Sequence, residues 1–294
     1  MGEMAGSAEL TGRRFPRPRV VVSRCITFDP VRYDGSLIPS GIVERMKPFV
    51  DFIPVCPEVE IGLGVPRAPI RIIRTGGGDR LVQPSTGRDL TDTMERFARD
   101  FLDGLPPVDG FILKYKSPSS GKSGAKVYPD TESASPVGRG PGIFGRAVLD
   151  RFGRFPIEDE GRLRDGRIRD HFLTSIFTIA RFREAREGGK IRDLARFHEE
   201  NQLLLGAIGG RRAEAMDRLL GNPGKKSPQE IYALYEDLLL SVLRHPRQER
   251  DPGDRAFPPP YPEELDSIEG KAAGGLGMTG REPRSRNGVP RAGR

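Results

Sequence analysis

The stretch Val-Val-Val-Ser-Arg-Cys at residues 20–25 decides the fold, because a short apolar run of the buried-strand type ends there in a polar turn. Other short apolar runs follow, and Pro54 in the second of them predicts an edge strand or an early end. They lie at residues 52–55, 70–73 and 111–113, with a weaker one at 126–128. These runs predict strands of a parallel or mixed sheet.

Helical patterns lie between these strands. Apolar residues from Met94 to Leu105 recur at helical spacing and form one continuous stripe. Asp89 or Thr91 can cap the first turn, and the prolines at 106–107 end the helix. Shorter helices are expected at 41–47 and 143–152. The first half is therefore predicted to be α/β, a small Rossmann-like sheet with flanking helices.

The second half, from His171 to Arg244, shows only helical patterns. One helix opens at Ser227 with a capping box and with proline at its first position. We expect a separate all-α helical domain after a boundary near 158–166. The predicted organisation is a disordered lead at 1–18, an α/β domain at 19–160, a helical domain at 165–246 and a disordered tail at 247–294.

Composition narrows the class of protein. The net charge of +7 and the pI of about 9.6 permit an anionic ligand without demanding one, since no run of five Lys or Arg occurs. We therefore do not expect nucleic acid as a partner. The two cysteines exclude a disulfide-dense secreted scaffold. No membrane-spanning run and no secretory signal is visible, so the cytoplasm is the expected compartment and no membrane partner is expected.

Two phosphate-binding motifs fail on inspection. Gly121-Lys122-Ser123 resembles the end of a P-loop, but Lys116 stands where the motif needs glycine, and a strand follows instead of a helix. Gly140, Gly142 and Gly145 match G-x-G-x-x-G only formally. Their segment is either a plain loop or a nest that offers backbone N–H groups to an anion. The three histidines share no metal-ligand spacing.

Both cysteines follow predicted strands. Cys25 ends the first and Cys56 the second, and the segment 114–121 follows the fourth. Ligands of open α/β sheets bind at the carboxyl ends of the strands, so these segments should face one crevice. Lysines near a thiol would favour the thiolate. The alternative is that both cysteines are small buried apolar residues.

Several short motifs in this half occur in a familiar order; they lie at residues 22–25, 31–35, 56–59, 62–69 and 117–121. On these motifs, residues 19–150 resemble the thiouracil desulfidase family, small α/β proteins that hold an iron–sulfur cluster. The second half, with its Phe197-His198 pair before a Leu-rich helix, more loosely resembles the YbgA-like helical domain of unknown function.

The resemblance implies a 4Fe-4S cluster held by three cysteines, with one iron open to take sulfur from a thiolated base. Cys25 and Cys56 match two of these ligands, and Ser120 stands where the third cysteine belongs. Serine is a much poorer ligand for cluster iron than thiolate. Either the site binds a cluster with an unusual third ligand, or a homodimer shares one, or no cluster is held.

The resemblance also suggests roles for other side chains. Glu58 is the natural group to move protons, and Ser117 or Ser119 could relay a proton or bind substrate. Positive charge for a thiolated base, a similar anionic ligand or a leaving sulfide would come from Arg32, Arg67 and Lys114. Arg32 could instead pair with Asp34, and Arg67 could cap a turn.

Two functions from different classes follow. The first is an iron–sulfur desulfidase that removes sulfur from a thiolated heterocycle. The second is a non-catalytic ligand-binding or partner-binding module that has lost the third cluster cysteine, with the helical half as its interface. A metal-free redox switch of the two cysteines is a third reading.

Overall fold

The computed structural model describes residues 14–244 and 258–265. The predicted lead at 1–13 and the predicted tail at 247–257 and 266–294 lie outside the described residues. The first of two sheets is wholly parallel, with the strand order β2-β1-β6-β9. Its strands are β1 (Arg19–Ser23), β2 (Asp51–Val55), β6 (Gly110–Leu113) and β9 (Ile157–Asp159). β2 lies at the edge, as its proline predicts.

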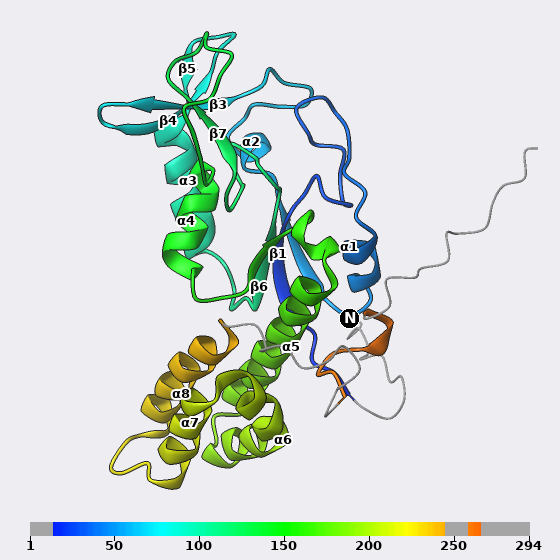
Figure 1. Ribbon diagram of the computed structural model, residues 1–294, viewed down its shortest axis with the longest axis vertical. Helices are drawn as coiled ribbons and strands as arrows, with labels where there is room; N and C mark the ends of the chain where they lie inside the picture. The colour runs from blue at the N-terminus through cyan, green and yellow to red at the C-terminus, as the bar shows by residue number, and fades with distance from the viewer. Residues whose placement is uncertain (1–13, 245–257, 266–294) are drawn as a thin grey trace, which may run out of the picture.

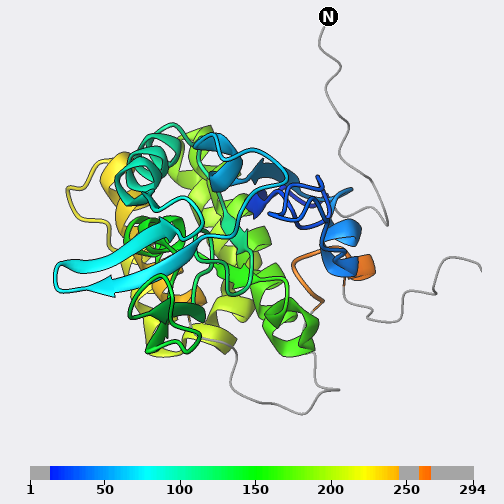
Figure 2. The ribbon, with the colours of Figure 1, turned by 90° about the horizontal axis from the view of Figure 1, so that it is seen from above.

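A second, mixed sheet has the order β5-β4-β3-β7-β8, in which only β3 and β7 pair in parallel. Its strands are β3 (Arg71–Thr75), β4 (Gly78–Gln83), β5 (Arg88–Asp89), β7 (Ala125–Tyr128) and β8 (Gly138–Gly140). Figure 2 shows the β3–β4 hairpin, in cyan, projecting from the rest of the molecule. The sequence predicted one sheet, and two of its expected strands, β3 and β7, belong to this second one.

Helices cover both faces of the first sheet, and a helical region follows it (Figure 1). The α-helices are α1 (Gly41–Met46), α2 (Pro57–Glu60), α3 (Thr91–Asp103), α4 (Ile143–Phe152), α5 (Gly166–Gly188), α6 (Ile191–Gly209), α7 (Arg211–Gly221) and α8 (Pro228–Leu243). Two 3-10 turns are η1 (Arg162–Arg164) and η2 (Glu263–Leu265). The predicted fold class, α/β followed by helices, is confirmed. So is the capping box of α8.

Strand β1 lies at the centre of two apolar cores. Val20 and Val22 pack with α1 and α5 on one face, whereas Val21 packs with α3 and α4 on the other. This alternation is the period of a strand between two helical layers. α5 spans two cores, since Phe172 packs against the sheet and Phe182 packs within the helical region.

Part of the predicted disordered tail is ordered. Tyr261 and Leu265 are fully buried in the core on the α1 and α5 side of the sheet, so the prediction is wrong at 258–265. Phe15, in the predicted lead, also packs there, edge-on to Phe177 with 6.4 Å between ring centroids. These aromatic and aliphatic side chains bury enough apolar surface to order short polar and proline-rich segments. Among the described residues, no helix is long and apolar enough to cross a membrane.

Candidate functional site

The site lies at the carboxyl ends of β1, β2 and β6. Cys25 follows β1, and Cys56 follows β2 as the residue that precedes α2, with Pro57 at the first helical position. The two strands stay paired to their ends, because the backbone N–H of Arg24 donates to the carbonyl of Val55. Both cysteine side chains are buried. The fold thus brings both cysteines to the same edge of the sheet, as strand topology predicts.

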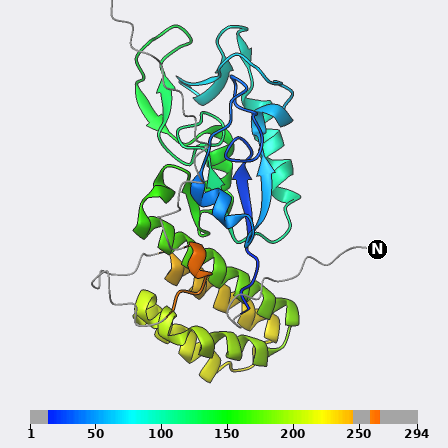
Figure 3. The same ribbon diagram turned by 90° about the vertical axis from the view of Figure 1, so that its right-hand side faces the viewer.

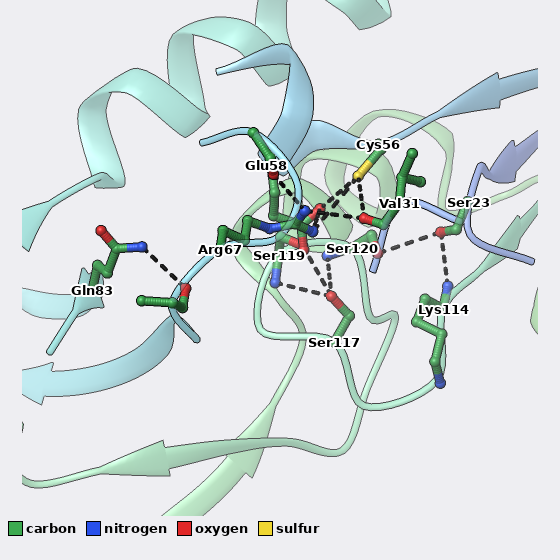
Figure 4. A network of polar contacts seen from close by, with 12 residues as sticks. Ser23, Val31, Cys56, Glu58, Arg67, Gln83, Lys114, Ser117, Ser119 and Ser120 are labelled. Carbon is green, nitrogen blue, oxygen red and sulfur yellow. Dashed lines mark hydrogen bonds and ion pairs between the residues drawn. The ribbon is translucent and has the colours of Figure 1, made fainter. Parts of the chain in front are cut away.

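Glu58 is the centre of a polar network at this edge (Figure 4). One carboxylate oxygen, Oε1, accepts a hydrogen bond of 2.5 Å from the Ser119 hydroxyl. The other, Oε2, accepts one of 3.4 Å from the Cys56 thiol and lies 3.8 Å from the Arg67 guanidinium. Glu58 and Arg67 have side chains only 14% and 5% exposed. A largely buried carboxylate therefore contacts a hydroxyl, a thiol and a cation at once.

Arg67 reaches this carboxylate from a long loop. Its Nη1 donates to the carbonyls of Val31 and Gly64, at 3.0 Å each, and its Nη2 lies 3.9 Å from the Cys56 sulfur. Its backbone N–H donates to the carbonyl of Tyr33. Arg67 therefore fixes two loops over the cysteine as well as supplying positive charge. The bond to the Gly64 carbonyl agrees with the turn-capping role that the sequence allowed, and a role of Arg67 toward a ligand stays a prediction.

A serine turn presents the opposite side of the network. The Ser117 Oγ accepts hydrogen bonds from the backbone N–H groups of Ser119 and Ser120, at 3.3 and 3.1 Å. It also lies 2.9 Å from the Ser119 Oγ. Ser117, Ser119 and Glu58 therefore form a continuous chain of hydrogen-bonding groups. Such a chain can carry a proton.

The glycine-rich segment before α4 holds this turn in place. The N–H of Gly142 donates to the carbonyl of Gly121 at 2.8 Å, and the N–H of Gly145 donates to that of Ser119 at 3.0 Å. A Cβ at Gly142 would lie 2.3 Å from the Ser119 oxygen, and one at Gly145 would lie 2.2 Å from the Gly121 oxygen. The suggested anion nest is therefore wrong at these amides, because they donate to the serine turn. The glycines permit close packing of backbones.

The donor set does not fit a cluster held by three thiolates. The chain has two cysteines, and the Ser120 hydroxyl accepts a hydrogen bond of 3.3 Å from the buried Ser23 hydroxyl. Within 14–244 and 258–265, no group of three His, Cys, Asp or Glu side chains is arranged to hold a metal ion. A hydroxyl in place of the third thiolate is a poor match to cluster iron. A cluster shared across a dimer stays a prediction.

Both thiols are held in the neutral form. Burial, the Glu58 carboxylate and the neighbouring Cys56 raise the pKa of Cys25 to about 12. Burial and Glu58 raise the pKa of Cys56 to about 11, against the opposing effects of the Val59 N–H and Arg67. The expectation that nearby lysines favour the thiolate is therefore wrong. The cost of burying a charge and the repulsion from Glu58 outweigh the effect of the lysine.

Lys114 and Arg32 lie outside the Glu58 network. The Lys114 Nζ contacts Glu160 Oε1 at 2.5 Å and the Tyr115 carbonyl at 2.9 Å. Arg32 donates to Ser36 at 3.1 Å and lies 3.9 Å from Asp34, the pairing that the sequence allowed as an alternative. The structure thus brings Arg67, but neither of these two cations, to the carboxylate.

Glu160 was not predicted to lie at the site; it is buried and also accepts a hydrogen bond of 2.9 Å from the Tyr115 N–H. It ties the start of the serine loop to the end of β9. Its signal was the acidic run at 158–160, which was assigned to a domain boundary. The register of Leu113 with Asp159 places that run at the site edge of the sheet.

The fold and site together define an α/β protein with a thiol and carboxylate site at the ends of parallel strands. Residues 20–160 match the family model described as 2-thiouracil desulfurase. The uncharacterized protein YbbK of Bacillus subtilis (strain 168) is 28% identical over 153 residues, which cover 50% of this chain and 98% of that protein. None of the solved structures gives a significant match. The family match ends before α5, so the YbgA-like resemblance of the helical half stays a prediction.

Proposed function

We propose that residues 20–160 cleave the carbon–sulfur bond of a thiolated heterocycle and release sulfide. The match to the 2-thiouracil desulfurase family supports this class of reaction. The observation that carries the proposal is the largely buried Glu58 carboxylate, which contacts the Ser119 hydroxyl on one oxygen and the Cys56 thiol on the other. Such a carboxylate can act as a general base at a site shielded from solvent.

The proposed reaction is a hydrolysis, and it needs no electron donor or acceptor. Water adds to the thiocarbonyl carbon, the carbon–sulfur bond breaks, and the sulfur leaves as hydrogen sulfide. The new carbonyl oxygen comes from water. Glu58 takes one proton from the attacking water, and the chain through Ser119 and Ser117 exchanges protons with the departing sulfur. The reaction consumes one water for each sulfide released.

The surrounding groups give this site its electrostatic character. Arg67 places a buried positive charge near Glu58 and Cys56, where it would stabilise negative charge that develops on the leaving sulfur. The Cys56 thiol donates its one proton to Glu58, so it helps to hold the carboxylate beside Arg67.

A non-catalytic binding module is the second candidate, and one observation favours it. Ser120 stands where the resemblance expects a third thiol, and its hydroxyl accepts a hydrogen bond from Ser23. A site built this way would bind a thiolated heterocycle through Glu58 and Arg67 without releasing sulfide. Equilibrium dialysis with 2-thiouracil, together with a sulfide assay, separates the two candidates.

The test compares two glutamates of α2. Glu58→Gln removes the proposed base, whereas Glu60→Gln alters a carboxylate that pairs with Arg24 at 2.5 Å and is 37% exposed. We expect sulfide release from 2-thiouracil to fall about 100-fold or more in Glu58→Gln. Glu60→Gln should stay close to the unaltered chain. Equal loss in both variants would remove Glu58 from the proposed role.

A further inference from the structure

Residues 258–265 form a short segment, Pro-Pro-Pro-Tyr-Pro-Glu-Glu-Leu, that lies against the α/β core (Figure 3, orange). Within it, Tyr261 and Leu265 are fully buried, and the prolines at 260 and 262 are buried as well. Glu263 and Glu264 point to solvent and are exposed. The segment therefore presents two apolar anchors on one side and two charges on the other.

The two anchors lie against different helices. Tyr261 contacts α5, and Leu265 belongs to η2, which packs against α1. The Tyr261 hydroxyl donates to Asp170 on α5, and its ring centroid lies 6.3 Å from that of Phe177 on the same helix. Leu265 closes η2, because its N–H donates to the Pro262 carbonyl at 3.0 Å, and η2 packs against α1. Tyrosine is an effective anchor, since a large ring and a polar tip are fixed by only two torsions.

In composition the segment is closer to a peptide ligand than to a helix or strand of a protein core. Four of its eight residues are proline, which restricts the backbone before docking and lowers the entropy lost on binding. Its recognition rests on side-chain anchors in a helical face, the mode used by proline-rich peptides on aromatic-lined surfaces.

We propose that the face formed by α1 and α5 is a recognition surface for a proline-rich segment with Tyr and Leu anchors, and that residues 258–265 fill it in cis. Tyr261 and Leu265 belong to the same apolar cluster as Cys25 and Phe172. If the segment leaves this face, we expect the cluster to open to solvent more often. This inference does not depend on the reaction proposed for the Glu58 site.

The test uses the full chain and the alkylation rate of Cys25, read by peptide mass spectrometry so that Cys56 is scored separately. The double variant Tyr261→Ala, Leu265→Ala should raise the Cys25 rate roughly tenfold or more, because local opening becomes easier. Glu264→Ala, an exposed change in the same segment, should leave the rate unchanged. A labelled peptide of residues 258–265 should bind the double variant and restore protection.

The milder variant Tyr261→Phe keeps the ring and removes only the hydrogen bond to Asp170. Tyr261→Phe should raise the alkylation rate of Cys25 less than the double variant does. If circular dichroism shows that the double variant is unfolded, Tyr261→Phe replaces it in the comparison. Cys25 rates that are equal in the unaltered chain, Tyr261→Phe and a folded double variant would overturn the proposal. So would a peptide that binds the double variant no better than a scrambled sequence.

Discussion

Replacing Gly145 by alanine should damage both the stability and the site, because α4 is packed directly on the serine turn. The added Cβ would lie 2.2 Å from the Gly121 carbonyl oxygen and 3.0 Å from that of Ser120. Real Cβ atoms essentially never approach closer than 3.0 Å, so the backbone of the turn must move. The nearest atoms belong to the backbone, and a rotamer change of a side chain cannot relieve the contact.

The magnitude follows from three contributions. Overpacking costs about 1–3 kcal/mol. Moving the turn weakens the bonds from the Gly142 and Gly145 N–H groups, each worth about 1 kcal/mol net. Alanine stabilises a helix by about 0.5–1 kcal/mol relative to glycine, which offsets part of this loss. The expected loss in the free energy of unfolding is therefore about 3 kcal/mol.

Gly140→Ala is the matched control, since a Cβ at Gly140 has nothing within 4 Å. It should change the free energy of unfolding by less than about 0.5 kcal/mol. Urea unfolding followed by tyrosine fluorescence suits this chain, which has no tryptophan. Equal unfolding free energies for the two variants would refute the close packing between α4 and the serine turn. Sulfide release should fall only in Gly145→Ala, because the shifted turn carries Ser119 away from the site carboxylate.

Three further changes test other parts of the account. In Glu58→Gln the pH midpoint for Cys56 alkylation should be lower than in the unaltered chain, because a neutral amide no longer repels the thiolate. Asp109→Asn should destabilise the protein by about 3 kcal/mol, since it breaks a buried 3.0 Å ion pair with an α5 arginine. Tyr235→Phe should cost about 1 kcal/mol in urea unfolding, because the His198 Nδ1 loses its 2.9 Å partner.

Each of these changes has a contrasting outcome. An unchanged alkylation midpoint in Glu58→Gln would mean that burial alone sets the thiol pKa. Arg154→Gln breaks an exposed pair with Asp237 and should cost less than about 0.5 kcal/mol. If Asp109→Asn lowered the free energy of unfolding no more than this control does, the buried pair would not be what stabilises the packing of the sheet against α5. A Tyr235→Phe variant as stable as the unaltered chain would mean that water replaces the tyrosine hydroxyl.

Apolar periodicity predicted the helices and strands that are buried on one face or on all sides. β1, α3 and α4 carry continuous apolar patterns and appear close to where the sequence places them. β4 and β9 were not predicted, because their sequences, GDRLVQ and IED, are largely polar. β4 forms through antiparallel pairing in a hairpin, and β9 through pairing with β6. β4 depends on its hairpin partner and β9 on a strand far along the chain, and neither dependence gives an apolar period within the strand itself.

α7 was missed for a related reason. Only Ala213 and Met216 of this charged helix are buried, so its apolar stripe is too narrow to recognise. The opposite error occurred at 258–265, where proline content indicated disorder but Tyr261 and Leu265 are anchored in a core. Composition indicates how much apolar surface a segment can bury by itself. Here Tyr261 and Leu265 are buried against α1 and α5, which the composition of the segment does not reveal.

Strand topology predicted that Cys25 and Cys56 lie at one edge, because the carboxyl ends of parallel strands meet there. The partners of the charged side chains could not be predicted in the same way. Lys114 pairs with Glu160, which is distant in the sequence and enters the site through β9. The state of the thiols followed from burial and from the Glu58 charge, which outweigh the nearby lysine.

The most direct test of the proposed function measures sulfide and uracil together when the anaerobically purified full chain is given 2-thiouracil. We expect one sulfide for each uracil formed, with both products lost in Glu58→Gln. Binding of 2-thiouracil without sulfide release in the unaltered chain would contradict the proposed reaction and favour the binding module. Equal turnover by the unaltered chain and Glu58→Gln would contradict the role of the carboxylate on which the account rests.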